Sequence, residues 1–149
     1  MRKTKGFTLI EILVVVAIIC VLMAFVLPGL MGSKARSNEK MAKAEIRQFE
    51  TALDMFYVDN GVFPAHIDGT YSSSALLKAF KGSAETKNYY SFKKGRIRGE
   101  EYFSPLDNPY FYRNNHSQKT KTSDMFNPDR FDIWTKDRLG EEKGVNNWD

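Results

Sequence analysis

The chain opens with a short basic leader, and a long run of apolar residues follows it. From Ile12 to Leu27 no side chain is charged or strongly polar. The apolar segment 7–31 is long enough to cross a bilayer core of roughly 30 Å as an α-helix. Gly6 precedes this run, whereas the cut site of a secretory signal peptide follows its apolar region. A cut after Gly6 would therefore remove only the leader, 1–6, and leave the helix on the mature chain.

A second pattern extends from residue 34 to about residue 59. Its apolar positions recur at intervals of three and four residues, which places them on one helical face: Ala42, Ile46, Phe49, Leu53 and Phe56. Asp59-Asn60-Gly61 is typical of a helix end, because glycine takes the left-handed C-cap conformation, and Pro64 prevents the helix from resuming. The pattern predicts an amphipathic helix whose apolar stripe needs a covering layer.

Pro28 lies between these two helical segments. Proline removes a helix hydrogen bond and clashes with the preceding turn, so we expect a kink or local unwinding there. The amphipathic pattern resumes after Gly32-Ser33, which favours a single long helix with a kink. Plain termination of the first helix at this point is the alternative.

The rest of the chain predicts a small domain that covers the stripe. Ser72-Ser73-Ser74 can cap a short helix over 75–80. Aromatic residues after the Asn108-Pro109 turn indicate a strand, and Phe131-Asp132-Ile133-Trp134 alternates as a second strand does. The expected fold is α+β, with a long N-terminal helical spine, membrane-spanning in its first half, packed against a small antiparallel sheet. The domain would occupy residues 32–149.

Charge and cysteine content limit the classes of partner and the location to be expected. Three of the 22 basic residues lie in the leader, so its removal leaves 19 basic against 18 acidic residues and no basis for a nucleic-acid partner. Basic residues alternate with aromatic ones around residues 87–98, which we interpret as a solvated loop with its aromatic rings packed underneath. The leader's positive charge predicts a cytoplasmic N-terminus. Cys20 is the only cysteine of the sequence, so no intrachain disulfide is possible.

The N-terminal motif Lys5-Gly-Phe-Thr-Leu-Ile-Glu11, ahead of a long apolar helix, resembles the processing motif of type IV pilins and type II secretion pseudopilins. The resemblance implies that a prepilin peptidase cuts after Gly6 and that the new N-terminal residue, Phe7, is methylated. A carboxylate inside the membrane costs a few kcal/mol and is a functional candidate by default. The resemblance implies that Glu11 meets the N-terminal amine of a neighbouring subunit during filament assembly. The alternative is a Glu11 that snorkels to the cytoplasmic interface.

Three further elements resemble the major pseudopilins of type II secretion. These are the Asp59-Asn-Gly-Val-Phe-Pro64 segment, the Asn108-Pro-Tyr-Phe-Tyr112 segment and the strand that begins at Phe131. In pilin-like proteins a proline at the place of Pro28 marks where the helix can melt in the filament. Adhesive and motility pilins commonly close a C-terminal loop with a disulfide, and Cys20 cannot provide one. A type IV pilin for adhesion, motility or DNA uptake is nevertheless the main alternative.

The C-terminal segment holds the candidate metal ligands. Calcium prefers carboxylate and carbonyl oxygens from flexible loops, and Asp137, Glu141 and Glu142 are of that type. Major pseudopilins have a calcium loop here that ends in an Asn-Trp pair like Asn147-Trp148. The cations that flank Asp137 weaken such a site, so a solvated turn closed by Trp148 is the alternative.

The sequence contains no phosphate loop, nucleophile elbow or paired-histidine motif, and His66 and His116 stand alone. We therefore do not expect an enzyme. The expected function is that of a pseudopilus subunit that polymerises through its N-terminal helix and helps to export folded proteins. The partners implied are further copies of the chain, the prepilin peptidase, minor pseudopilins and the inner-membrane secretion platform. The expected location is the inner membrane, crossed once, with the C-terminal domain in the periplasm. A membrane-anchored binding protein that never assembles is an alternative from another class.

Overall fold

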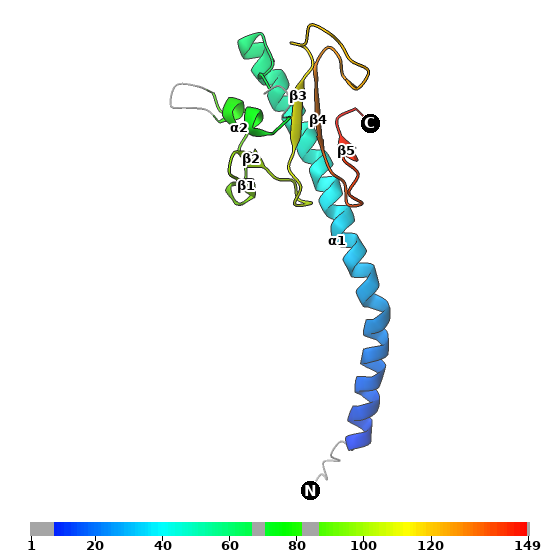
Figure 1. The fold of residues 1–149 in the computed structure, drawn as a ribbon. Coiled ribbons are helices and arrows are strands. Elements are labelled where there is room, and N and C mark those ends of the chain that lie inside the picture. The colour runs from blue at the N-terminus through cyan, green and yellow to red at the C-terminus, as the bar shows by residue number, and fades with distance from the viewer. Residues whose placement is uncertain (1–7, 67–70, 82–86, 149) are drawn as a thin grey trace. The chain divides into compact units, whose positions relative to one another are not determined.

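The computed structural model describes residues 8–66, 71–81 and 87–148, with only the backbone described for residues 26–31. The chain divides into two compact units, Met1–Arg36 and Ser37–Asp149, and helix α1, Leu9–Asn60, contributes to both (Figure 1). We refer to the second unit as the head. The helix is unbroken at residue 28, so the structure has one long helix and no termination there.

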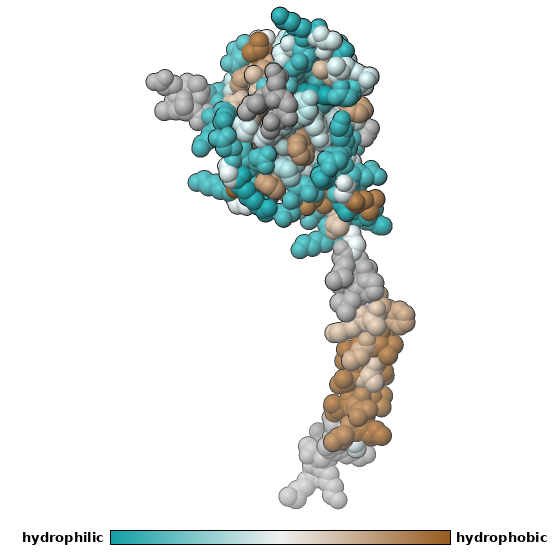
Figure 2. All heavy atoms as spheres, viewed as in Figure 1, coloured by the Kyte–Doolittle hydropathy of each residue, from teal (hydrophilic) through white to brown (hydrophobic). Residues whose placement is uncertain are grey.

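In the first unit, the helix over residues 9–25 carries exposed apolar side chains on every side. All described side chains from residue 8 to residue 25 are exposed, including Leu9 at 84% and Phe25 at 80% (Figure 2). Within the described residues, no helix combines the length and the apolar character that a membrane crossing requires. The predicted span 7–31 includes Phe7 and the side chains of residues 26–31, which lie outside the described part of the structure.

In the head, α1 buries the predicted stripe. Ala42, Ile46, Phe49 and Leu53 are buried, and Phe56 is half-buried with its ring centroid 5.2 Å from that of Tyr89. The helix ends at Asn60, as the sequence predicts. Gly61 follows with a φ of +73°, and its N–H donates to the Tyr57 carbonyl at 2.7 Å.

The described residues of the head form two small antiparallel sheets. Strands β3 (Phe111–Asn114), β4 (Phe131–Thr135) and β5 (Val145–Asn146) form one sheet in that order, with Tyr112 opposite Ile133. Strands β1 (Ile97–Arg98) and β2 (Glu101–Tyr102) form the other, after the short 3-10 helix Lys94–Arg96. The α+β class, the long N-terminal helix and both predicted strands are confirmed. The strand expected after Asn108-Pro109 begins only at Phe111.

Helix α2 runs from Ser74 to Phe80, and of the serines predicted to cap it only Ser72 binds a backbone N–H of its first residue. Ser73 occupies the N-cap position and makes no side-chain cap hydrogen bond. Its hydroxyl instead accepts the backbone N–H of Tyr102 at 2.8 Å, which ties α2 to β2. The N–H of Ser74 donates to the Ser72 hydroxyl at 3.2 Å. Ser72 therefore supplies the local bond, and Ser73 supplies a tertiary one.

Aromatic rings supply most of the layer over the stripe. The Phe49 ring centroid lies 4.8 Å from that of Tyr90 and 5.2 Å from that of Tyr110, both in edge-to-face geometry. Phe92 packs 4.9 Å from Tyr102. The aromatic rings of segment 87–98 thus lie against the core, as the sequence predicts.

Candidate assembly site

The N-terminus of α1 is closed by a reciprocal pair of side chains. Glu11 Oε2 accepts the backbone N–H of Thr8 at 2.8 Å and the Thr8 hydroxyl at 2.7 Å, and Thr8 Oγ1 accepts the N–H of Glu11 at 3.3 Å. This is a capping box, in which each side chain satisfies a backbone donor that the helix leaves unpaired. The spacing Thr8-x-x-Glu11 is the capping-box pattern. The sequence prediction missed it because it considered Glu11 only for assembly.

The capping box places a carboxylate at the positive end of the helix dipole. Both bonds from Thr8 go to Oε2, and no hydrogen bond from a described residue engages Oε1. A cationic group that approaches this helix end would therefore find an oriented acceptor. The processing residues Gly6 and Phe7 lie outside the described residues, and their roles stay predictions, as does the kink at Pro28.

The exposed apolar surface of α1 surrounds this carboxylate. A helix that is hydrophobic all round is stable only when lipid or protein covers it. Between residues 8 and 25, Thr8, Glu11 and Cys20 are the residues other than aliphatic or aromatic ones, and Cys20 is also exposed. Among the described residues nothing covers this apolar surface, and Glu11 is the one charge between residues 8 and 25.

The segment from Asp59 to Pro64 connects the end of α1 to other parts of the head by hydrogen bonds. Asp59 Oδ2 accepts a hydrogen bond from the Lys87 ammonium at 2.9 Å and another from the Tyr89 hydroxyl at 3.0 Å, and these bonds lower the Asp59 pKa. The Pro64 carbonyl accepts the Tyr112 hydroxyl at 2.9 Å. The motif therefore fastens the end of α1 to the aromatic segment and to β3, which is a structural role.

A buried carboxylate interrupts the apolar stripe. Glu45 lies three residues after Ala42 and four before Phe49, so it belongs to the same helical face and is only 6% exposed. It accepts the Tyr110 hydroxyl at 2.8 Å and pairs with the Arg96 guanidinium, whose Nη1 lies 2.9 Å from Oε2. Burial and the neighbouring Glu45 charge raise the pKa of Tyr110 above its usual range. The sequence prediction missed this pair because it counted only apolar residues on the stripe.

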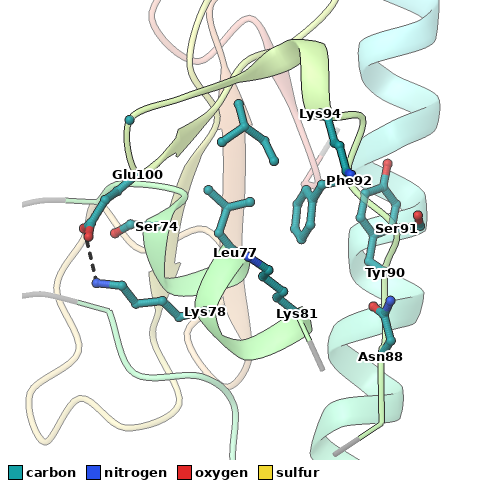
Figure 3. Close-up of a pocket in the computed structure, with 12 residues that line it drawn as sticks. Ser74, Leu77, Lys78, Lys81, Asn88, Tyr90, Ser91, Phe92, Lys94 and Glu100 are labelled. Carbon is teal, nitrogen blue, oxygen red and sulfur yellow. Dashed lines mark hydrogen bonds and ion pairs between the residues drawn. The ribbon is translucent and has the colours of Figure 1, made fainter. Parts of the chain in front are cut away.

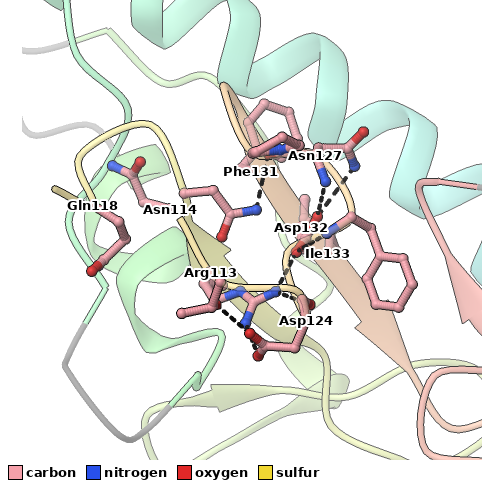
Figure 4. Close-up of polar contacts among 12 residues, drawn as sticks. Arg113, Asn114, Gln118, Asp124, Asn127, Phe131, Asp132 and Ile133 are labelled. Atoms are coloured by element: carbon pink, nitrogen blue, oxygen red, sulfur yellow. Dashed lines mark hydrogen bonds and ion pairs between the residues drawn. The ribbon is translucent and has the colours of Figure 1, made fainter. Parts of the chain in front are cut away.

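A second buried pair closes the loop between β3 and β4. Arg113 Nη2 lies 2.6 Å from Asp132 Oδ2, and its Nη1 lies 2.6 Å from Asp124 Oδ2 (Figure 4). Asp132 is fully buried and also accepts the Asn127 N–H at 2.9 Å. Hydrogen bonds from Thr122 and Arg113 lower the Asp124 pKa to about 2. Asp132 had been expected on the polar side of an alternating strand, but all five residues of β4 are buried.

Two carboxylates of the C-terminal loop, those of Asp137 and Glu142, have partners within the loop. Asp137 Oδ1 accepts the N–H groups of Leu139 at 2.8 Å and of Glu141 at 2.9 Å. The Glu142 carboxylate pairs with Lys136 at 2.5 Å. No three His, Cys, Asp or Glu side chains gather around a common point in the described residues. Calcium ligation by Asp137, Glu141 and Glu142 therefore stays a prediction, and we derive no step from it.

Trp148 closes this loop, as the alternative interpretation expected. Its ring stacks on Phe126 with centroids 4.2 Å apart and planes 6° from parallel. The packing is tight at Gly144, where a Cβ atom would lie 2.6 Å from the Cβ of Asp137.

Comparison with known proteins identifies the family. Residues 1–27 match the prokaryotic N-terminal methylation motif, and residues 29–128 match the family described as type II secretion system (T2SS), protein G. The chain belongs to the type II secretion system protein G family. Its predicted assignment to the major pseudopilins is confirmed. Membership in this family associates the chain with the cell envelope.

The chain is also similar to individual proteins, two of them named core protein G and one a pilus component. The chain is 33% identical to the type II secretion system core protein G of Pseudomonas aeruginosa, over 99% of this chain and 97% of that protein. The Vibrio cholerae core protein G is 45% identical, over only 46% of this chain and 47% of that protein. The type IV wide pilus major component PilA4 of Thermus thermophilus is 29% identical, over 77% of this chain and 91% of that protein. No solved structure matches this chain.

Proposed function

We propose that this protein is a structural subunit of a type II secretion pseudopilus, polymerises through the N-terminal part of α1 and helps to export folded proteins across the outer membrane. The match of residues 29–128 to the protein G family carries the proposal. In this pilin-like design, the apolar part of α1 anchors the subunit once in the inner membrane, and the head lies in the periplasm. A prepilin peptidase cuts after Gly6, and Phe7 is then methylated.

The capping box suggests how Glu11 takes part in assembly. The cut would place a cationic amine on Phe7, directly before Thr8. When a neighbouring subunit brings its amine to Glu11, Thr8 already holds Oε2 and so orients the carboxylate. Pairing with that amine offsets the cost of burying the Glu11 charge among apolar helices. Minor pseudopilins and the inner-membrane platform are the further partners of this assembly.

A strain that lacks this chain tests the secretion role. We expect loss of exported folded proteins from the medium, intact twitching, and recovery of secretion when the wild-type chain is returned. Loss of twitching with intact secretion would favour the second candidate, a type IV pilin. The likeness to the Thermus wide-pilus component is the observation behind that candidate.

The Glu11→Ala variant tests whether the subunit must assemble. We expect membrane insertion to be preserved and filaments and secretion to be lost. The control is Asp129→Ala, because the Asp129 side chain is 92% exposed and lies in the head. Intact secretion by Glu11→Ala would instead support an anchored protein that never polymerises.

A further inference from the structure

The head carries a pocket between α2 and the segment that leads into β1. The pocket has a volume of about 540 Å³. Leu77, Phe92 and Ile97 give it apolar walls, and Figure 3 shows Leu77 and Phe92 directed into the same space. Nothing in the capping box or in the buried ion pairs uses this pocket.

The rim of the pocket is cationic. Lys78, Lys81 and Lys94 line it, together with one carboxylate, Glu100, which pairs with Lys78 at 3.2 Å (Figure 3). Among the described residues, Lys81 and Lys94 have no ion-pair partner. Apolar walls below two ammonium groups that no described carboxylate pairs with fit a ligand that has an apolar side chain next to a carboxylate.

The head itself presents such a group on the C-terminal loop. Leu139 is 71% exposed, which is the highest value among the described large apolar side chains beyond α1. Its N–H bond to Asp137 and the adjacent Gly140, at a φ of +87°, hold it at the tip of the loop. Glu141 is exposed two residues later, and no ion pair engages it in the described part of the chain.

The pocket and the tip lie on different sides of the head. In Figure 1, α2 and β1 are on one side of the β3–β4 pair, and the chain that leads into β5 is on the other. A tip on one side therefore cannot reach the pocket of its own chain. Two surfaces that differ and that lie apart make a head-to-tail contact, which extends as an open polymer if it does not close into a ring.

We propose that Leu139 of one copy enters the pocket of the next copy, with its Glu141 beside Lys81 and Lys94. This inference rests on the proposed function, because so small a contact needs α1 polymerisation to bring the heads together. The charge complementarity of rim and tip favours a second copy over an unrelated partner. The contact would fix the rotation of neighbouring heads in the pseudopilus.

Disulfide trapping in the full-length chain tests the contact. In a Cys20→Ala background, the pair Ile97→Cys and Leu139→Cys should give a ladder of dimers, trimers and higher species when filaments are oxidised. Each single-cysteine variant should give dimers at most, because a ladder needs two different sites in every copy. The matched control pairs Leu139→Cys with Val62→Cys, a site that is 56% exposed and outside the pocket.

A charge swap gives an independent reading in the chain with its native Cys20. Glu141→Lys and Lys94→Glu should each lower secretion about tenfold or more, since like charges would face each other, and the double variant should recover most of the loss. Filaments that form without a ladder, with secretion unchanged in both single variants, would overturn the contact and leave the pseudopilus function intact. Absence of filaments from the wild-type chain would contradict both proposals. A crosslink between Ile97→Cys and a different protein would also overturn the contact between copies.

Discussion

The two ends of helix α1 differ in how their side chains are exposed and what they contact. Up to Phe25, described side chains are apolar and exposed in the single chain, and the one charge is held only by its neighbour Thr8. From Ala42 onward the helix buries one face under aromatic rings and accepts a buried ion pair at Glu45. The head therefore covers its own apolar face, whereas the proposed function requires lipid and other subunits to cover the first segment. Changes in the head should alter folding, and changes near Glu11 should alter assembly.

The largest effect on folding is expected from Phe49→Ala. Phe49 is fully buried and contacts four aromatic rings, those of Tyr90, Phe92, Tyr102 and Tyr110. Its truncation should lower the free energy of unfolding by about 4 kcal/mol, measured by urea unfolding of the detergent-solubilised chain. Met55→Ala, on the exposed face of the same helix, is the control and should change it by less than about 0.5 kcal/mol. Equal effects at both positions would contradict the assigned core.

The next effect is expected from Asp132→Asn. The change leaves the buried Arg113 without its fully buried partner, although Asp124 remains. Removal of one partner from a buried pair is strongly destabilising, and we expect a loss of about 3 kcal/mol. Asp129→Asn is the matched exposed control. An unchanged urea midpoint for Asp132→Asn would show that the pair does not hold the β3–β4 loop.

The free energy of unfolding of the head should fall at alkaline pH and at acid pH for different reasons. Burial raises the pKa values of Tyr110 and Tyr112 in the folded state, so the unfolded state loses these protons first. Their contribution is complete below the ordinary tyrosine pKa of about 10 and is lost as the pH rises above it. The lowered pKa of Asp124, about 2, gives a contribution that is lost as the pH falls from about 4 to about 2.

Urea midpoints measured from pH 2 to pH 11 check both limbs. Tyr110→Phe should flatten the alkaline limb in part, because Tyr112 remains, and should leave the acid limb unchanged, whereas Asp124→Asn should flatten only the acid limb. A Tyr110→Phe chain with the full alkaline dependence would show that another group causes it.

The smallest effect is expected from calcium. A ligand that binds only the folded state raises its stability as RT ln(1 + [L]/Kd). Because Asp137 and Glu142 already have partners within the loop, we expect the thermal midpoint of the head to differ by less than about 2 °C between millimolar calcium and a chelator. A rise of several degrees, lost in Asp137→Ala, would support the calcium ligands implied by the family resemblance.

The elements that were predicted correctly are those indicated by periodic apolar positions and by turn residues. The stripe from Ala42 to Phe56, the helix end at Asn60 and the strand at Phe131 all follow from spacing or from turn residues, which are local properties. The buried polar residues were not predicted. Glu45 and Asp132 occupy core-facing positions, and only their distant partners, Arg96 and Arg113, make that burial possible. Sequence spacing cannot identify partners that the fold brings together.

In the candidate site, too, some features could be predicted from the sequence and others could not. The motif around Glu11 identified the family and the carboxylate, but the bond to Thr8 was missed although both residues lie within one helical turn. Conversely, the C-terminal carboxylates were selected by residue type and by the resemblance to the calcium loop of major pseudopilins. Their arrangement depends on Lys136 and on backbone donors, which the residue types do not reveal.

The most direct test of the contrast between the two ends of α1 is filament formation by Glu11→Gln, observed by electron microscopy beside Thr8→Ala and the wild-type chain. Glutamine can keep the capping bonds but carries no charge. If Glu11 pairs with a neighbouring amine, Glu11→Gln should form no filaments. Thr8→Ala should still assemble with a helix end weakened by about 1 kcal/mol, and the urea midpoint of the head should be unchanged in both. Normal filaments from Glu11→Gln would show that Glu11 only caps its own helix, and would contradict the account of assembly.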